Sequence, residues 1–340
     1  MIQHSSPFIE KHDIDAVMNQ LSSGYIASGE MVEKFEDLLK EFLDVPYLFC
    51  CCNGTHALFL ALKSLALKMN AEVILPTYVC HNVWDAVVQA NLKPVLCDIG
   101  KFWSMTPDNI ENVLTDKTGA IIVVHPMGMT VDTSSFKKFG IPIIEDFCQN
   151  FGGVKNGKKV KIEGDVAVFS FHATKCLTTG EGGAIATCDE MIYSELTEFI
   201  KYKSLYNPLS DLQAALGIIQ LQKYSKMLSK RLNIANKYFC CVREDLTFRF
   251  KQTVDDNIFF RFLLWKNNPN FEELRNDFAQ MNIAVRKGVD ELLHKRYHID
   301  CAKSYRKAEK AFNNTISIPI YPSISESDQN KIIDAVNLLL

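Results

Sequence analysis

Short apolar runs alternate with stretches of helical periodicity along the first two-thirds of the chain. In the segment 30–43, one apolar stripe at helical spacing is formed by Met31, Phe35, Leu38, Leu39 and Phe42. Further helical patterns fall at 12–21, 56–69 and 80–90, and the apolar runs fall at 47–52, 72–75, 94–98, 120–125, 142–146, 165–170 and 183–187. Strands with little polar alternation are typical of parallel sheets that are buried on both faces. The pattern therefore predicts an α/β fold, in which helices flank a mainly parallel sheet.

The last third of the chain has a different order of elements. A long helical pattern covers 209–242. It is followed by a strand pattern at 258–265, a helix at 271–280, a strand at 281–286 and a helix at 325–340. This mixed order predicts a smaller α+β C-terminal domain. For a chain of 340 residues we expect a large domain at 1–225 and a small domain at 226–340.

The charge balance limits the classes of partner. The chain has 37 Lys and Arg residues and 40 Asp and Glu residues, which give a net charge of −3. This balance offers no electrostatic reason to expect nucleic acid or an anionic membrane as a partner. No apolar run approaches the roughly 18–20 residues that span a bilayer. Because the N-terminus also lacks a secretory signal pattern, we expect a cytoplasmic protein.

The eleven cysteines do not indicate a framework of disulfides. Their number is odd, no C-x-x-C pair occurs, and the chain is far larger than a disulfide-stapled domain. Cys50, Cys51 and Cys52 are consecutive, so their side chains cannot readily converge on one metal ion. We expect buried, apolar thiols in a reducing cytosol and no metal site.

Two segments with polar residues follow predicted strands, where open α/β sheets bind their ligands. In Asn53-Gly54-Thr55, glycine lets an anion approach the backbone, the helix start offers free N–H groups and threonine adds a hydroxyl. This segment can hold a phosphate, although it is also a good helix cap. Glu145 and Asp146 end an apolar strand, where a carboxylate can bind a metal, bind a cationic ring nitrogen or cap a helix.

Two further segments carry a lysine and an aromatic residue. Lys175 lies between apolar residues and glycines. A lone lysine is usually a solvated charge, but a lysine that loses its hydration has a lowered pKa and attacks carbonyl groups. Tyr78 directly follows a strand, where it either packs in the core or stacks on a flat ring. A lysine for an aldehyde, a carboxylate for a pyridine nitrogen, a phosphate seat and a stacking ring together match the needs of pyridoxal 5'-phosphate (PLP).

An ordered series of motifs carries a resemblance to a known family. The segment 164–183, GDVAVFSFHATKCLTTGEGG, resembles the lysine region of the DegT/DnrJ/StrS sugar aminotransferases, a branch of the fold-type I PLP enzymes. Glu145-Asp-x-x-Gln149, N-G-T-x-A-L at 53–58 and S-D-L-Q-A-A-L-G at 210–217 resemble other motifs of that family. The resemblance implies a fold-type I aminotransferase with a large PLP-binding domain and a small C-terminal domain.

The same resemblance implies roles at the matching positions. Lys175 would hold the cofactor as a Schiff base and move protons as general acid and base. Asp146 would pair with the pyridinium nitrogen, Gln149 would lie near the 3-oxygen of the ring, and Tyr78 would stack on the ring. The residues that would hold the phosphate are Gly54, Thr55 and Ser170.

The resemblance further implies a homodimer with shared active sites. In the family, an Asn-x-Arg-Met-like segment reaches the cofactor phosphate of the neighbouring subunit, and here Tyr206-Asn-Pro-Leu209 stands in its place. A match without a gap puts Tyr206 on the Asn position and Pro208 on the Arg position, and a shift of one residue restores Asn207. We assign the cross-subunit contact to Asn207, with Tyr206 as the alternative.

The implied reaction is a ping-pong transfer of an amino group. An amino acid, usually glutamate in this family, donates the group, and a keto group on a nucleotide-linked sugar accepts it. Sugar dehydratases of the family carry His where this chain has Lys175, so the lysine favours transamination. A PLP-dependent dehydratase or another PLP enzyme is the alternative, and a non-catalytic protein with the same fold is a third hypothesis.

Overall fold

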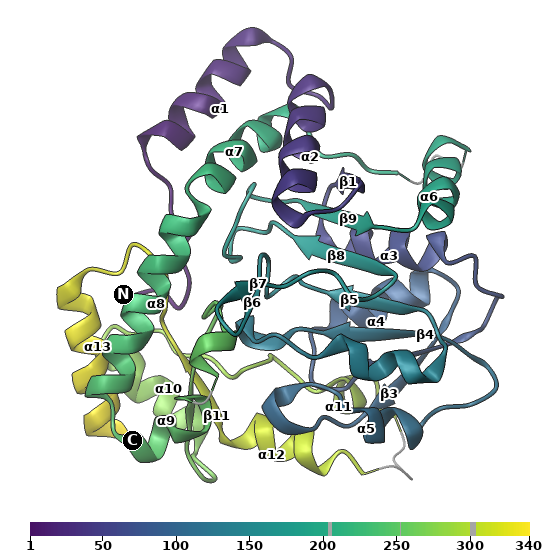
Figure 1. The fold of residues 1–340 in the computed structure, drawn as a ribbon. Helices are drawn as coiled ribbons and strands as arrows, with labels where there is room; N and C mark the ends of the chain where they lie inside the picture. Colours follow the sequence, from purple (N-terminus) through teal and green to yellow (C-terminus); the bar gives the residue numbers. More distant parts are fainter. Residues whose placement is uncertain (203–205, 252, 300–303) are drawn as a thin grey trace.

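A seven-stranded sheet forms the centre of the larger lobe (Figure 1). The structure, a computed structural model, describes residues 1–202, 206–251, 253–299 and 304–340. The strands of this sheet are β1 (Tyr47–Cys51), β2 (Glu72–Pro76), β3 (Lys93–Cys97), β4 (Thr118–Val124), β5 (Ile143–Asp146), β8 (Val166–Ser170) and β9 (Gly183–Thr187). They lie in the order β1-β9-β8-β5-β4-β2-β3. Only β9 pairs in the antiparallel sense, with β1 and β8, so the predicted mainly parallel sheet is confirmed.

Helices cover both faces of this sheet. Successive residues of a strand point to opposite sides, and here both sets of side chains are apolar and buried. Val166 and Val168 of β8 pack in a core shared with α3 and α4, whereas Ala167 and Phe169 pack in a core shared with α2 and α7. The helices of this lobe are α1 (Lys11–Ser23), α2 (Glu30–Leu43), α3 (Gly54–Ser64), α4 (His81–Gln89), α5 (Pro107–Glu111), α6 (Glu190–Tyr202) and α7 (Asp211–Gln222). Short 3-10 turns lie at Lys101–Trp103, Pro126–Gly128 and Thr133–Phe139, and a small hairpin joins β6 (Val154–Lys155) to β7 (Lys158–Lys159).

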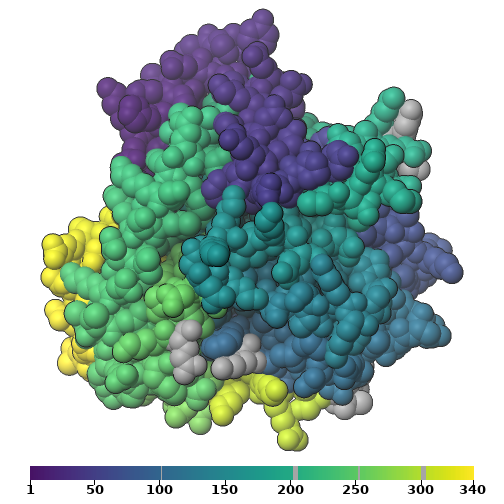
Figure 2. All heavy atoms as spheres, viewed as in Figure 1, coloured from purple at the N-terminus to yellow at the C-terminus, as the bar shows by residue number. Residues whose placement is uncertain are grey.

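Helix α1 lies beside α7 at one end of the molecule, where it projects from the rest of the surface (Figures 1 and 2). A buried carboxylate holds it there. Asp13 accepts a hydrogen bond of 2.8 Å from the side-chain amide of Gln220 and forms an ion pair with Lys223. One side of α1 is thereby attached to the lobe.

The smaller lobe has its own apolar core, which includes Ile2 from the N-terminus and residues from 234 onward. Its elements are α8 (Tyr224–Cys241), α9 (Glu244–Lys251), β10 (Phe262–Trp265), α10 (Phe271–Gln280), α11 (Leu293–Arg296), α12 (Arg306–Asn314), β11 (Thr315–Ile318) and α13 (Glu326–Leu339), with a 3-10 turn at Val254–Asp256. The strands β10 and β11 pair in the antiparallel sense. The division of the chain near residue 225 stays a prediction.

Three predicted elements differ from the structure. The helix predicted at 209–242 is divided into α7 and α8, because Lys223 leaves the helical conformation with ψ 6°. The strand predicted at 258–265 begins only at Phe262, since Phe259 has a left-handed backbone with φ 52°. No strand forms at 281–286, where Ile283 and Arg286 make only isolated bridges.

Candidate active site

The candidate residues lie where neighbouring strands end. Asp146 is the last residue of β5, Ser170 is the last residue of β8, and Gly54 begins α3 after β1. β5 and β8 are adjacent and parallel, so their carboxyl ends open on the same edge of the sheet. Tyr78 follows β2 on the same sheet. The fold therefore gathers segments that are more than a hundred residues apart in the sequence.

The two acids at the end of β5 have different surroundings, because adjacent strand residues face opposite sides. Glu145 is 1% exposed and accepts hydrogen bonds from Thr133 Oγ1 (2.7 Å) and from the backbone N–H groups of Glu163 (2.7 Å) and Gly164 (2.6 Å). Its Oε1 also lies 3.2 Å from Nε2 of His125. Glu145 is therefore a buried structural carboxylate, and only Asp146 is left for a ligand.

His125 completes this buried network. Its Nδ1 accepts a hydrogen bond of 3.0 Å from the backbone N–H of Val131, so the proton resides on Nε2 and points at Glu145. Burial would raise the pKa of Glu145, but the hydrogen bonds from His125, Gly164 and Thr133 outweigh burial and lower it. Glu145 is thus ionised in the folded protein and fixes the strand that presents Asp146.

The charges of Lys175 and Asp146 act on the same two thiols, those of Cys80 and Cys148. Burial raises the pKa of the Cys148 thiol, and the Asp146 carboxylate raises it further, while the positive charge of Lys175 lowers it. Burial also raises the pKa of the Cys80 thiol. There too, the charge of Lys175 lowers the pKa and the charge of Asp146 raises it. The lysine and the aspartate therefore lie around one space. The thiols stay neutral there at neutral pH, so they do not compete with Lys175 as nucleophiles.

The backbone and a neighbouring aromatic ring position Lys175. Its N–H donates to the carbonyl of His172 (2.8 Å), which closes a turn directly after β8. Its Nζ lies 5.1 Å from the ring centroid of Phe260, which packs in the core shared with α2 and α7. The lysine is thus half-buried, and the aromatic ring lies next to its ammonium group.

The start of α3 offers a seat for an anion. Asn53 Oδ1 caps the helix by accepting from the N–H of His56 (2.8 Å), so the first N–H groups of the helix, those of Gly54 and Thr55, have no acceptor within the helix. A Cβ at Gly54 would lie only 2.8 Å from Cβ of Ser170, which shows how closely the two segments approach. The cap and the phosphate seat, which the sequence left as alternatives, are both compatible with this geometry because different residues provide them.

Gln149 has a fixed orientation. Its Oε1 accepts a hydrogen bond of 2.8 Å from the backbone N–H of Met127. The NH2 group of its side chain is therefore the end that remains for a ligand. This placement fits the predicted position of Gln149 near an acceptor oxygen of the cofactor ring.

Tyr78 is not placed as a ring-stacking residue would be. It is 1% exposed, and burial raises its pKa above the ordinary value. Its hydroxyl lies so close to Gly288 that a Cβ there would be 2.2 Å away. The ring thus packs in the core and presents no open face. Core packing was the alternative hypothesis for Tyr78. Its stacking role stays a prediction that this placement does not favour.

The segment at 206–209 passes next to the start of α3. The hydroxyl of Tyr206 donates to the carbonyl of Cys50 (2.6 Å), which ties this side chain to its own sheet. The backbone of Asn207 accepts from the N–H of Cys52 (2.8 Å) and donates to Nε2 of His56 (3.2 Å), and its side chain is exposed. Of the two candidates for a contact with a partner subunit, only Asn207 has a side chain that points away from the fold.

Three residues of this site were not predicted: Cys80, Cys148 and Phe260. Cys148 lies two residues after Asp146 and could have been proposed from that spacing. Phe260 has no such signal, because it lies far from Lys175 in the sequence and only tertiary packing brings the two together. Among the described residues, no group of His, Cys, Asp and Glu side chains is suited to a metal ion, and no helix is long and apolar enough to cross a membrane.

Comparisons with known proteins show the family and the fold of this chain. The model of the DegT/DnrJ/EryC1/StrS aminotransferase family matches residues 7–337. A GDP-perosamine synthase of Escherichia coli O157:H7 is 29% identical over 97% of this chain and 96% of its own. The aminotransferase PseC of Helicobacter pylori, which is involved in the biosynthesis of pseudoaminic acid, has a TM-score of 0.90 at 21% identity over 98% of both chains. The protein Spr1654 of Streptococcus pneumoniae in its PLP form has a TM-score of 0.84 at 23% identity, over 99% of this chain and 98% of its own.

Proposed function

Because the chain belongs to the DegT/DnrJ/EryC1/StrS aminotransferase family, we propose that it moves an amino group from L-glutamate to a keto group on a nucleotide-linked sugar. One observation carries the proposal, namely that the charges of Lys175 and Asp146 both act on the thiols of Cys80 and Cys148. The similarity to a GDP-perosamine synthase supports a nucleotide-linked sugar as the acceptor. A dehydratase is less favoured, because Lys175 occupies the position where the family's dehydratases carry His.

The cofactor is pyridoxal phosphate, and the residues of the site fit it. The close approach of Gly54 and Ser170 at the start of α3 provides a seat for the phosphate. Asp146, which is 5% exposed, supplies a carboxylate for the ring nitrogen, and Gln149 supplies a donor for the 3-oxygen. When bound, the cofactor supplies an aldehyde that takes up and releases an amino group and a ring that withdraws electrons from the reacting carbon.

The side chains around the cofactor then have separate roles. Lys175 Nζ would bind the cofactor covalently, and, once released, it would remove and return a proton at the reacting carbon. Asp146 keeps the ring nitrogen protonated by its negative charge. Glu145 and His125 hold β5 in place so that Asp146 keeps its position. The neutral thiols of Cys80 and Cys148 line the space without adding a second charge.

The donor can be tested without the sugar. When L-glutamate is added to the PLP-loaded enzyme, we expect the absorbance of the lysine-bound cofactor to disappear and 2-oxoglutarate to form in an equal amount. The absorbance is followed in a spectrophotometer, with D-glutamate as the control that leaves it unchanged. If another amino acid is required, the assignment of L-glutamate as the donor is wrong. If no amino acid changes the spectrum, the proposal that the protein is a transaminase is wrong.

Asp146→Asn should lower kcat while the protein still binds PLP. The amide cannot carry the negative charge that keeps a ring nitrogen protonated. A hydrogen bond to a charged group contributes about 1.5–3 kcal/mol, which corresponds to a loss of about ten- to a hundredfold in rate. Steady-state kinetics with a keto sugar nucleotide would measure it, and Asp165→Asn on the neighbouring strand connection serves as the control. If the kcat of Asp146→Asn equals that of the native enzyme, the proposed pairing of Asp146 with the ring nitrogen is wrong.

A homodimer explains an apolar stripe on α1. Ile14, Met18 and Leu21 are 52%, 59% and 58% exposed and recur at helical spacing, and Tyr25 follows at 78%. Apolar side chains exposed in such a row mark an interaction surface. The exposed side chain of Asn207 beside the phosphate seat is then available for the contact with the partner subunit.

The double substitution Met18→Glu with Leu21→Glu should therefore separate the subunits. Two carboxylates in an apolar interface would lose their hydration without a partner, which costs several kcal/mol. We expect native protein to elute from gel filtration as a dimer and the variant as a single chain. Leu338→Glu, at an even more exposed apolar residue on α13, should stay dimeric. If the native protein elutes as a single chain, the dimer and the role of Asn207 are both wrong.

A further inference from the structure

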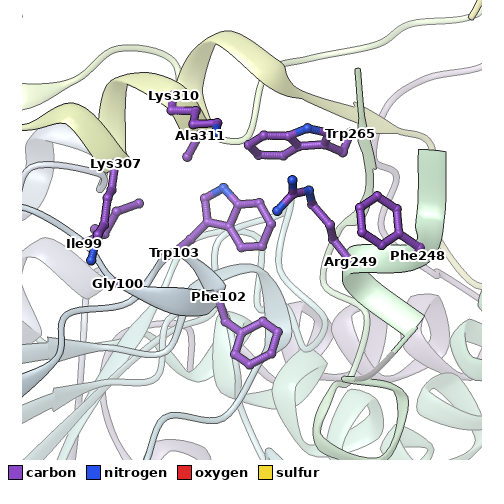
Figure 3. Close-up of a pocket in the computed structure, with 10 residues that line it drawn as sticks. All are labelled: Ile99, Gly100, Phe102, Trp103, Phe248, Arg249, Trp265, Lys307, Lys310 and Ala311. Atoms are coloured by element: carbon purple, nitrogen blue, oxygen red, sulfur yellow. The ribbon is translucent and has the colours of Figure 1, made fainter. Parts of the chain in front are cut away.

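A cavity of about 540 Å³ opens between the two lobes beside α12 (Figure 3). The larger lobe contributes the loop after β3, and the smaller lobe contributes residues of α9, β10 and α12. We call it the tryptophan pocket, after Trp103 and Trp265 in its wall. None of its lining residues belongs to the candidate active site. Its volume lies in the range of pockets that bind small molecules.

The charges of the tryptophan pocket have one sign. Arg249, Lys307 and Lys310 line it, and among the described lining residues there is no carboxylate. The nearby Asp98 is already engaged, because its two oxygens accept the backbone N–H groups of Lys307 (3.1 Å) and Ala308 (2.9 Å) at the start of α12. The three cationic side chains therefore favour an anionic ligand.

Flat rings line the same space. The guanidinium of Arg249 lies 4.3 Å from the ring centroid of Trp265 and 5.1 Å from that of Phe248, and Figure 3 shows it below Trp265. Trp103 meets Trp265 edge to face at 6.2 Å. The indole N–H of Trp103 is buried and has no acceptor in the part of the chain that the structure describes. A ligand with a flat ring and acceptor atoms would match these surfaces.

The backbone holds Trp103 in an uncommon conformation. Phe102 and Trp103 have φ values of 58° and 60°, a left-handed conformation that is unfavourable for residues with bulky side chains. The turn is closed by the N–H of Gly100, which donates to the carbonyl of Ser104 (2.6 Å). Such strain persists where the surrounding structure imposes it, and it occurs frequently at ligand sites.

We propose that the tryptophan pocket is a binding site for a nucleoside diphosphate, separate from the active site. The base lies against the indoles of Trp103 and Trp265, and the diphosphate contacts the ammonium groups of Lys307 and Lys310. Aromatic walls and several cations together distinguish this ligand from an inorganic anion, which needs no ring, and from a neutral aromatic compound, which needs no charge.

The intrinsic fluorescence of the PLP-loaded enzyme reports on this site, because two of its three tryptophans line the pocket. On titration with UDP or GDP, we expect saturable quenching that survives Trp84→Phe, since Trp84 stacks on Tyr297 elsewhere. Uridine or guanosine alone and pyrophosphate alone should each bind at least about tenfold more weakly than the intact nucleotide, because each makes only part of the contacts.

The double substitution Lys307→Gln with Lys310→Gln tests the location. We expect it to raise the Kd of UDP or GDP in the fluorescence titration by about tenfold or more, whereas Lys331→Gln on α13 leaves the Kd unchanged. The KM for the sugar nucleotide and kcat should equal the native values in both variants. Unchanged quenching in the double variant would overturn the proposal. An increased KM for the sugar nucleotide would also overturn it, because the pocket would then hold part of the substrate instead of a separate ligand.

Discussion

Lys175→Ala is expected to abolish turnover and leave the fold intact. The substitution removes both the amine that binds the cofactor covalently and the general base at the reacting carbon. Positioned acid–base groups alone contribute about 10²–10⁴-fold, so we expect a loss of at least about 10⁴-fold when the covalent function is lost as well. The half-buried side chain contacts the ring of Phe260 but is not part of the buried network around Glu145, so the free energy of unfolding should change little.

Two further measurements separate a chemical role of Lys175 from a structural one. Lys175→Arg keeps the positive charge and most of the volume, yet its guanidinium does not condense with an aldehyde, so it should be nearly as inactive. Added methylamine should restore part of the proton transfer in Lys175→Ala but not in Lys175→Arg, whose side chain fills the space. Activity of Lys175→Ala within about tenfold of the native value would contradict the assigned role.

Glu145→Ala is expected to destabilise the protein more than any substitution of a ligand-binding residue. It would leave four donors near one buried position without their acceptor, those of His125, Thr133, Glu163 and Gly164. A buried donor without a partner costs about 1–3 kcal/mol, so a loss of about 3–5 kcal/mol is reasonable after some rearrangement. Urea unfolding at neutral pH measures this difference, and the exposed Glu198→Ala should stay within about 0.5 kcal/mol of the native protein.

The pH dependence gives Glu145→Ala a second readout. The pKa of Glu145 is lowered in the folded protein, so its contribution to stability is present above the unfolded pKa, about 4.3, and is lost as the pH falls through the folded value. The difference between native and Glu145→Ala proteins should therefore narrow below about pH 4. A difference of under about 1 kcal/mol at neutral pH would show that the network does not stabilise β5.

The same network explains why the two acids at the end of β5 cannot exchange roles. Asp146 and Glu145 are adjacent, but alternation along the strand directs one toward the ligand space and the other into the protein. The sequence identified both as candidates and left a metal, a ring nitrogen and a cap as alternatives. The hydrogen-bond partners of Glu145 distinguish the two acids. Those partners come from segments that no local sequence pattern connects to β5.

Local patterns predicted the elements of the larger lobe well, because buried parallel strands and amphipathic helices differ strongly in periodicity. The smaller lobe was harder. The strand predicted at 281–286 fails since Ile283 pairs with Ile2 at the other end of the chain, and one bridge does not make a strand. The long helix at 209–242 is divided at Lys223, whose backbone leaves the helical conformation and whose side chain pairs with the distant Asp13.

The amino-acid sequence by itself determined the class of fold, the order of the strands along the chain and the residues with the right chemistry at strand ends, including Lys175, Asp146 and Gly54. These depend on short-range periodicity and on motifs that can be read within a few residues. The burial of Tyr78, the approach of Phe260 to Lys175 and the meeting of Trp103 with Trp265 were decided only by the tertiary structure. Such contacts join segments far apart in the chain, and their formation depends on how the two lobes pack, which no local pattern records.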